Sequence, residues 1–242
     1  MSFEWPVMHL CSRQLRDIND SDILNNGLYR KCNVYKGGGG YDKFPLIYKQ
    51  RIGNLDVHNQ FVVQLRGCPL RCPYCYVTLD GVLTGECDYV NTEKLVTDFD
   101  NSGCSVFHLM GGAPALYIDH WPELLNQLNG KVFHSDLLLL EGEYKKDTLS
   151  KLSPYSNSLY AVSIKGYTEE EFYRNTGVRF NRELFHKNLA LIIEQNLPFY
   201  FTYTGMENSS IEAFSEYVIQ NFGESYLKDS FSIDIIHYNA LD

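Results

Sequence analysis

Short apolar runs alternate along this chain with segments in which apolar residues recur every three or four positions. The short runs are typical of buried strands, and the recurring positions are typical of helices with one buried face. The predicted strands cover residues 58–65, 104–110, 131–140, 159–164, 197–204 and 231–238. Helical patterns lie between them, at residues 92–100, 119–130 and 144–152, and again after residues 168, 181 and 209.

Capping residues mark where several of these helices begin and end. Asp119 is expected to cap the second helix, and Gly130 is expected to end it. Thr168 and Ser209 each begin a sequence of the capping-box type, with a glutamate three residues later. Asn181 is expected to open a longer helix.

Regular alternation of strands and helices predicts a parallel sheet, because each helix returns the chain to the same end of the next strand. Six such units form a curved, incomplete barrel, so the fold class is α/β, a partial (β/α)6 barrel with mostly parallel strands. We assign residues 54–242 to this barrel and residues 1–53 to an N-terminal extension that packs on it. The extension contains the run Gly37–Gly40, which is expected to act as a flexible hinge or linker.

Composition and charge narrow the function. The 242 residues are 44% hydrophobic, enough for one large core, and the formal net charge is −9. Nucleic-acid binding depends on cationic side chains, so this charge argues against nucleic acid as a partner. The start of the chain lacks a basic and apolar leader, and no run approaches the roughly 18 apolar residues of a membrane span. We therefore expect a cytoplasmic protein whose seven cysteines stay reduced.

Three cysteines carry the most specific signal. Cys68, Cys72 and Cys75 follow the first predicted barrel strand on one short, proline-containing loop. A 4Fe-4S cluster takes one thiolate on each of its four irons, so a site with three thiols leaves one iron open. The spacing predicts that these three residues are the metal ligands.

Two alternatives remain beside this interpretation. A structural zinc site takes four cysteine or histidine ligands, usually as two pairs, and no fourth ligand lies at matching spacing. An electron-transfer cluster would need a fourth cysteine, and Cys87, beyond the expected turn at Asp80-Gly81 and the pair Thr84-Gly85, is a possible partner. A zinc-stabilised or electron-transfer module is therefore the alternative from a different class of function.

The cysteine triad, with the aromatic Tyr74 directly before its third member, resembles the hallmark of the radical S-adenosylmethionine (SAM) superfamily. The resemblance implies a 4Fe-4S cluster and SAM as cofactors, with the methionyl group of SAM on the open iron and Tyr74 near its adenine. It also implies that a reductant such as a flavodoxin or ferredoxin supplies the electron that cleaves SAM. A 5′-deoxyadenosyl radical would then abstract hydrogen from a small-molecule or peptide substrate.

Two further segments extend the resemblance. Residues 110–114 resemble the "GGEP" motif of that superfamily, whose backbone receives the amino group of SAM; Gly111 and Gly112 are kept, and Ala113 replaces the glutamate. Residues 162–166 resemble the corresponding region of glycyl-radical-enzyme activases and their archaeal relatives. There Ser163 replaces an aspartate, and Lys165 keeps a cation that could bind the carboxylate of SAM.

Two more residues at strand ends complete the predicted SAM site. Glu141 follows the third strand, and His237 lies in the last, where activases offer a histidine. Generation of a glycyl radical on a partner protein remains an alternative activity. No role is predicted for the other cysteines, which are Cys11, Cys32, Cys87 and Cys104.

Overall fold

The computed structural model describes residues 2–11, 19–32, 50–53, 59–75, 77, 79–204, 208–228 and 231–232. The predicted site residue His237 and the run Gly37–Gly40 lie outside the described residues, as does most of the last predicted strand.

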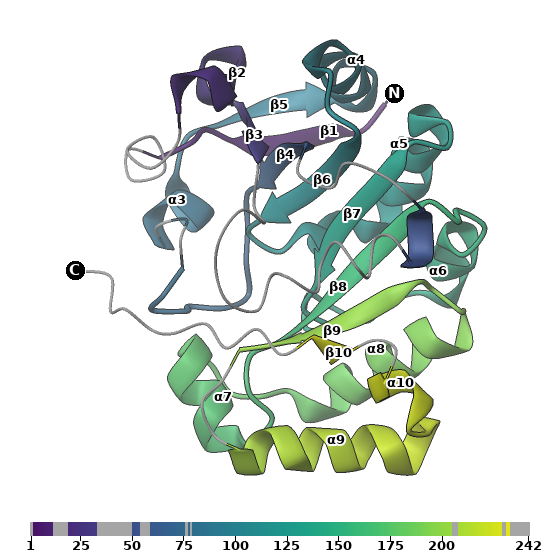
Figure 1. The fold of residues 1–242 in the computed structure, drawn as a ribbon. Coiled ribbons are helices and arrows are strands. Elements are labelled where there is room, and N and C mark those ends of the chain that lie inside the picture. Colours follow the sequence, from purple (N-terminus) through teal and green to yellow (C-terminus); the bar gives the residue numbers. More distant parts are fainter. Residues whose placement is uncertain are drawn as a thin grey trace.

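One ten-stranded sheet organises the described chain (Figure 1). Six of its strands, β4, β6, β7, β8, β9 and β10, lie side by side in this order and run parallel. They are the six predicted strands, and they form an open sheet, which confirms the predicted α/β partial barrel. Their bounds are β4 Gln60–Leu65, β6 Val106–Gly111, β7 Val132–Leu137, β8 Ser158–Ile164, β9 Phe199–Tyr203 and β10 Phe231–Ser232.

The remaining strands extend this sheet beyond β4 in the antiparallel sense. They are β1 Glu4–Met8, β2 Ile23–Leu24, β3 Tyr29–Cys32 and β5 Cys87–Asn91. Both β3 and β1 pair with the edge of β4 that faces away from β6, and β5 pairs with β1. The described part of the extension therefore covers a strand edge that would otherwise be open. The sequence did not predict β5, because Val90 is its one buried residue and the strand lacks an apolar run.

Helices follow most of the parallel strands and lie along the right and lower sides of the sheet in Figure 1. The α-helices are α3 Leu79–Thr84, α4 Thr92–Ser102, α5 Trp121–Leu128, α6 Lys146–Leu152, α7 Glu169–Thr176, α8 Arg182–Glu194, α9 Asn208–Phe222 and α10 Ser225–Lys228. Short 3-10 turns are η1 Asp20–Asp22, η2 Asn25–Gly27 and η4 Pro114–His120.

Two of the predicted caps are confirmed. The side chain of Thr168 accepts a hydrogen bond from the amide of Glu171 at the start of α7. The side chain of Asn181 accepts one from the amide of Leu184 at the start of α8. Each satisfies an amide that the first helical turn leaves without a partner.

Three local predictions are wrong. Asp119 does not cap α5, because the N-cap of this helix is His120. The carboxylate of Asp119 instead accepts hydrogen bonds from Lys145 and Thr148. Helix α9 begins at Asn208, so Ser209 is not its cap. For Asp119, the contacts of its carboxylate with Lys145 and Thr148 replace the predicted cap.

The third error concerns residues 79–84, which form α3 where a turn was expected at Asp80-Gly81. Val82 of this helix packs in a small apolar cluster with Met8 and Val77. Burial of Val82 against the extension therefore outweighs the low helix propensity of Gly81.

The two faces of the parallel sheet differ in chemistry. Alternate residues point to opposite faces, and in a parallel sheet paired residues share a face. The outer face carries Phe61, Phe107 and Phe133, which are fully or almost fully buried in the main core against Phe99 and Trp121. The inner face is mixed: beside buried apolar residues such as Val62 and Leu159, the strand register places on it the polar residues Gln60, Gln64, His108, His134, Asp136, Ser163, Tyr200 and Thr202.

Candidate functional site: a cysteine loop above a polar sheet face

The cysteine loop begins where β4 ends, and the described backbone around it holds it from three sides. The amide of Gly67 donates to the carbonyl of Val82 at 2.9 Å, and the amide of Ala113 donates to the carbonyl of Gly67 at 2.7 Å. The amide of Arg71 donates to the carbonyl of Thr176 at 2.7 Å. Elements α3, β6 and α7 thus fix the position of the loop.

Gly111 and Gly112 allow the closest of these contacts. A Cβ atom at Gly112 would lie 2.1 Å from the carbonyl oxygen of Gly67, and one at Gly111 would lie 2.8 Å from Cβ of Gln64. Real Cβ atoms do not approach other atoms so closely. The glycine pair is therefore required for packing against the end of β4 and the cysteine loop. Ala113, where the superfamily motif has a glutamate, is buried in the core.

The three thiols of Cys68, Cys72 and Cys75 are partly buried. A turn closed by the amide of Cys75 on the carbonyl of Cys72, at 3.1 Å, contains Tyr74. Burial raises the pKa of Cys68 to about 11, and the charges of Cys72 and Cys75 add to the increase. Burial also raises the pKa of Cys75, whereas the charge of Lys165 lowers it. Without a metal these two thiols are protonated, so metal binding must displace their protons.

Three thiols on one loop can serve two kinds of metal site. A structural zinc ion takes four cysteine or histidine ligands. A 4Fe-4S cluster bound by three thiolates keeps one iron open. The three partly buried thiols of the cysteine loop supply the ligands that such a cluster needs.

The remaining cysteines have different surroundings. The sulfur of Cys87 accepts a hydrogen bond from the guanidinium of Arg66 at 3.5 Å. Cys11 lies close enough to Cys75 for its charge to raise the pKa of that thiol. Cys32 ends β3, and Cys104 lies before β6, where burial raises its pKa. Cys11 is therefore near Cys75, whereas Cys87 is engaged by an arginine.

The predicted site residues of β8 lie at its carboxyl end. Ser163 pairs with Thr202 in the sheet register, and their hydroxyl oxygens are 3.2 Å apart. The ammonium group of Lys165 donates to the hydroxyl of Thr204 at 3.4 Å. Its charge acts on both Cys75 and Asp136, so Lys165 lies between the cysteine loop and the inner face of the sheet.

The carboxylate of Glu141 braces the loop after β7. It accepts hydrogen bonds from the amides of Leu138 and Leu140, at 2.8 and 3.0 Å, and from the hydroxyl of Tyr144 at 2.8 Å. Burial raises its pKa, and these hydrogen bonds oppose the increase. The charge of Glu141 also acts on Cys68, which places this loop near the thiols.

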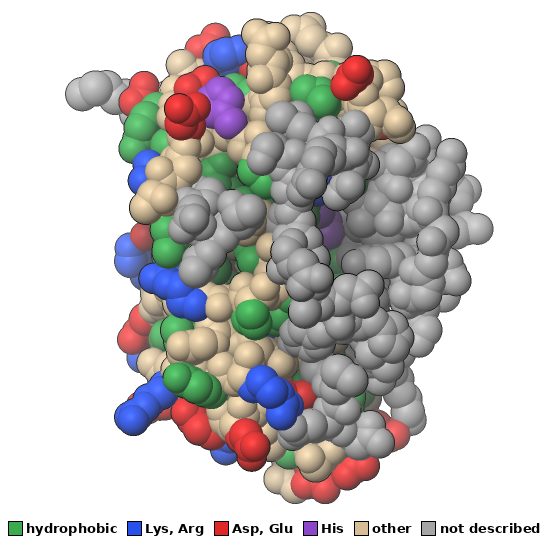
Figure 2. All heavy atoms as spheres, turned by 90° about the vertical axis from the view of Figure 1, so that its left-hand side faces the viewer, with side chains coloured by type: hydrophobic (Ala, Val, Ile, Leu, Met, Phe, Trp, Pro, Cys, Tyr) green, Lys and Arg blue, Asp and Glu red, His purple; other side chains and the backbone are tan. Residues whose placement is uncertain are grey.

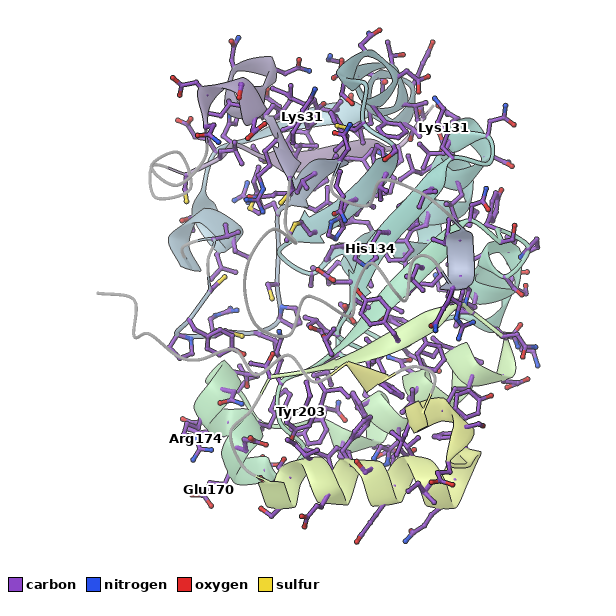
Figure 3. All side chains as sticks on the ribbon, viewed as in Figure 1. Lys31, Lys131, His134, Glu170, Arg174 and Tyr203 are labelled. Atoms are coloured by element: carbon purple, nitrogen blue, oxygen red, sulfur yellow. The ribbon has the colours of Figure 1, made fainter. Side chains whose placement is uncertain are left out.

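A group of polar side chains on the inner face was not predicted. Rings of His108 and His134, whose centroids are 4.2 Å apart, lie beside each other on β6 and β7 (Figure 3 labels His134). Burial lowers the pKa of both, that of His134 to about 3, so both imidazoles are neutral. The pKa of Asp136 is raised to about 6 by burial, against the charge of Lys165. The available signal was the presence of polar and titratable residues within the predicted strands.

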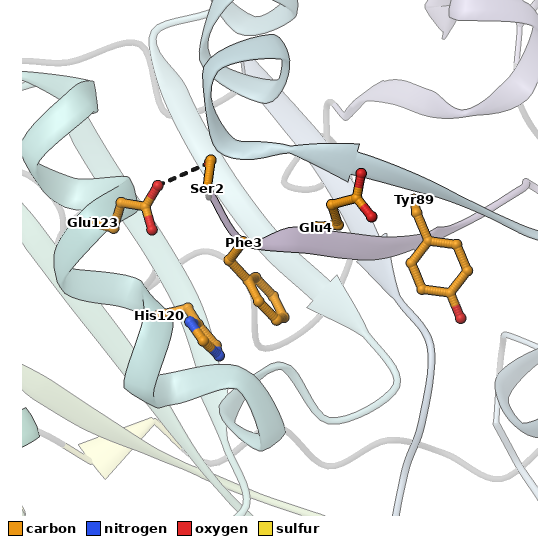
Figure 4. A pocket seen from close by; sticks show the side chains of 6 residues that line it. All are labelled: Ser2, Phe3, Glu4, Tyr89, His120 and Glu123. Atoms are coloured by element: carbon orange, nitrogen blue, oxygen red, sulfur yellow. Dashed lines mark hydrogen bonds between the residues drawn. The ribbon is translucent and has the colours of Figure 1, made fainter.

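A surface hollow of about 470 Å³ lies elsewhere, at the amino end of β1 (Figure 4). Phe3 stacks on His120 there, with ring centroids 3.6 Å apart, and Glu4 and Glu123 lie beside them. Met8, at the other end of the same strand, packs against Cys68 and Cys75. The hollow is therefore about 13 Å away along β1 and contains none of the predicted site residues.

Surface charge of both signs is present on the described part of the face shown in Figure 2. Lysine and arginine side chains alternate there with aspartate and glutamate. This distribution fits the negative net charge of the chain and gives no support to a nucleic-acid interface. Among the described residues, no helix combines the length and apolar character needed to cross a bilayer.

Fold and site together define a class: an α/β enzyme with an open parallel sheet and a three-cysteine loop after its first barrel strand. Residues 62–218 match the model of the Radical SAM superfamily. The chain therefore belongs to the radical SAM superfamily. This is an enzyme superfamily, and its cofactors are a 4Fe-4S cluster and SAM, as the cysteine motif predicted.

Solved structures agree in fold. Streptococcus suis SuiB bound to the precursor peptide SuiA has a TM-score of 0.52, with 17% identity over 66% of this chain and 36% of that chain. SuiB bound to S-adenosylmethionine has a TM-score of 0.52, with 14% identity over 85% of this chain and 49% of that chain. The radical S-adenosylmethionine methyltransferase TsrM from Kitasatospora setae, with cobalamin and a [4Fe-4S] cluster, has a TM-score of 0.50, with 14% identity over 73% of this chain and 34% of that chain.

These solved chains are much longer than the part they share with this protein, which spans at most about half of each. Among the curated proteins, none matches the sequence.

Proposed function

We propose that this protein cleaves SAM reductively at a 4Fe-4S cluster and uses the resulting radical to remove hydrogen from a peptide or small molecule. The observation that carries the proposal is the cysteine loop itself. Three neighbouring thiols lie at the carboxyl end of the first strand of an open parallel sheet, where α/β proteins place their ligands. Cys68, Cys72 and Cys75 would each bind one iron, and the fourth iron would remain for SAM.

Rigid support of the loop favours this role. The backbone contacts to Val82, Ala113 and Thr176 hold the loop that carries the thiols. A loop whose backbone is fixed in this way loses less conformational freedom when it binds a metal. The protein's part would therefore be to hold three thiolates in place.

Residues around the loop would bind SAM. Lys165, whose charge already acts on Cys75, would pair with the carboxylate of SAM, and Ser163 would donate or accept a hydrogen bond beside it. The backbone at Gly111 and Gly112 would offer polar groups to the amino group, and the ring of Tyr74 would pack near the adenine. Ala113, Glu141 and His237 remain further predictions for this site.

When bound, the reduced cluster supplies the electron that cleaves SAM to a 5′-deoxyadenosyl radical. Nothing in the described chain supplies this electron, so the proposal includes an external donor such as a flavodoxin or ferredoxin. The chain's own residues position the target hydrogen. The polar inner face, with Gln64 buried close below the cysteine loop, is the surface that would contact the substrate.

A peptide is the substrate class to test first. SuiB shares the fold and was crystallised with a precursor peptide. The likeness at 17% identity concerns the fold, so the substrate itself must be found by experiment.

The test is an anaerobic assay for 5′-deoxyadenosine. Protein reconstituted with iron and sulfide is given SAM and dithionite, and the nucleoside product is measured by chromatography. We expect product from the wild type and from Cys104→Ser, a cysteine outside the triad, but only background from Cys72→Ser. Wild-type protein with a full cluster that forms no 5′-deoxyadenosine would refute the proposal. One product molecule per chain of an added partner protein, together with a glycyl radical on that partner, would instead identify an activase.

A further inference from the structure

The inner face of the sheet contains a second set of metal-ligand side chains, separate from the cysteines. One ligand atom each from His108, His134 and Asp136 lies within 4.8 Å of the other two. His108 is opposite Val62 in the sheet register, three residues before the end of β4. The set therefore lies roughly 10 Å below the strand end that leads into the cysteine loop.

Neighbouring side chains orient both imidazoles. Nδ1 of His108 lies 2.6 Å from the amide oxygen of Gln60, to which it donates its hydrogen. Nε2 of His134 lies 3.0 Å from the hydroxyl of Tyr200. Histidines that bind metals usually have their second ring nitrogen held by such a partner, which fixes the tautomer and the direction of the ligating nitrogen.

The remaining nitrogen of His108 is the observation that points to a ligand. His108 is 4% exposed, and its Nε2 has no hydrogen-bond partner among the described residues. Because Nδ1 carries the hydrogen, Nε2 presents a lone pair inside the protein. A buried polar atom without a partner is costly, so a missing ligand is its simplest explanation.

Charges around the set decide which ligand fits. Asp136 is negative when ionised, and Glu141 acts on it from the loop after β7, whereas Lys165 opposes both. Arg30, which donates to the sulfur of Met110 at 3.7 Å, adds a positive charge near His108. The charges of these two carboxylates and two cations sum to zero. The affinity for a bound metal cation must therefore come from direct bonds to its ligands.

We propose that His108, His134 and Asp136 bind one divalent transition-metal ion inside the sheet. Two imidazoles and one carboxylate suit Zn²⁺, Fe²⁺ or Co²⁺, whereas Mg²⁺ and Ca²⁺ require mostly oxygen ligands. Metal bonds of about 2.1 Å need donor atoms about 3 to 4 Å apart, so the side chains close by up to about 1.5 Å on binding. Three protein ligands leave at least one position for an oxygen or nitrogen atom of the substrate.

The test uses full-length protein in two forms, because the cysteines also bind metals. In the first form, the 4Fe-4S cluster is reconstituted, Zn²⁺ is added and removed by desalting, and zinc is counted by mass spectrometry. We expect about one zinc per chain in addition to the cluster iron. In the second form, Cys68, Cys72 and Cys75 are all replaced by serine, and Co²⁺ binding is followed by its visible absorption. This form shows the site even if the cluster proposal is wrong.

Variants identify the ligands. Asp136→Asn keeps the shape of the side chain and should weaken Co²⁺ binding at least about a hundredfold. Tyr200→Phe keeps all three ligands and removes the partner of His134, so a loss of about tenfold is expected. His120→Gln, in the surface hollow of Figure 4, is the matched control and should bind cobalt like its parent.

Circular dichroism checks that each variant is folded. The proposal is overturned if the cluster-loaded protein retains no zinc, or if folded Asp136→Asn binds Co²⁺ as tightly as its parent.

Discussion

The two faces of the parallel sheet are made from alternate residues of the same strands, yet they differ in the side chains that they bury: stacked phenylalanines on the outer face, and two histidines and an aspartate on the inner face. Phe133 is buried on the outer face between Phe107, Trp121 and Tyr160, with ring centroids 5.5 to 6.3 Å away. Its neighbour His134 is equally buried but lies on the inner face beside a second histidine. Two neighbouring residues are thus equally buried, one in the apolar core and the other in a group of polar side chains.

This difference teaches how to interpret a buried strand. A strand covered on both faces by apolar elements has a continuous apolar sequence. Titratable residues within such a strand, such as His134 and Asp136 in β7, indicate that the face they share lines a functional interior. On this view, substitutions on the outer face should lower the free energy of unfolding. Substitutions on the inner face or in the cysteine loop should instead lower cofactor binding or SAM cleavage.

The largest effect is expected in the cysteine loop, above the inner face. Cys72→Ser should abolish cluster assembly and lower SAM cleavage to background, because two thiolates hold a cluster poorly. The partly buried serine should change the free energy of unfolding of the metal-free protein by less than about 1 kcal/mol. Iron analysis and urea unfolding check the two parts. If Cys72→Ser prevented the protein from folding, the distinction between the outer face and the cysteine loop would be contradicted.

On the outer face, Phe133→Ala should destabilise the protein by about 3–5 kcal/mol, since it leaves a cavity in the core. Urea unfolding of the metal-free protein measures this loss. Tyr89→Ala is the matched control, because Tyr89 is 65% exposed and its removal should cost less than about 0.5 kcal/mol. Similar costs at the two positions would contradict the assignment of the outer face as the main core.

Gly112→Ala tests the contact between the sheet and the cysteine loop. The added methyl group would lie 2.1 Å from the carbonyl oxygen of Gly67, so the loop must move, at a cost of about 1–3 kcal/mol. We expect lower stability together with lower iron content after reconstitution.

Gly223→Ala is the control for backbone strain. Its φ is +101°, and among the described residues no atom beyond its own chain neighbours lies within 4 Å of the added Cβ. It should cost about 1 kcal/mol without changing iron content. Full cluster loading in Gly112→Ala would show that the glycine contact does not position the thiols.

The smallest effect is expected at Lys165. Lys165→Met keeps most of the side-chain length and removes the charge, so SAM should bind about tenfold more weakly, as expected for loss of a charge-assisted hydrogen bond. The absorption of the cluster should stay unchanged. Lys151→Met removes an exposed lysine paired with Asp147 and should leave SAM affinity at the wild-type value. Equal SAM affinity in the two variants would remove Lys165 from the site.

Much of this arrangement could be predicted from local sequence. Apolar runs located all six barrel strands, and the triad of Cys68, Cys72 and Cys75 indicated the superfamily. Features that depend on contacts between distant segments could not be predicted. Strand β5 exists because β1 pairs with it, and Gly112 is required because the cysteine loop packs against it.

The inner polar face was missed for the same reason. His108 and His134 are 26 positions apart in the chain and meet only through the register of β6 and β7. Neither histidine forms a recognisable motif with its sequence neighbours. Their proximity therefore required the structure.

The central claim is that three thiols bind a cluster and leave one iron open for SAM. Electron paramagnetic resonance of the reduced, reconstituted protein, recorded with and without SAM, tests it most directly. We predict about four irons per chain and a change in the g values when SAM is added, because SAM binds directly to the open iron. A cluster signal that SAM leaves unchanged, or a purified protein that holds zinc on the three cysteines instead of iron, would contradict the account.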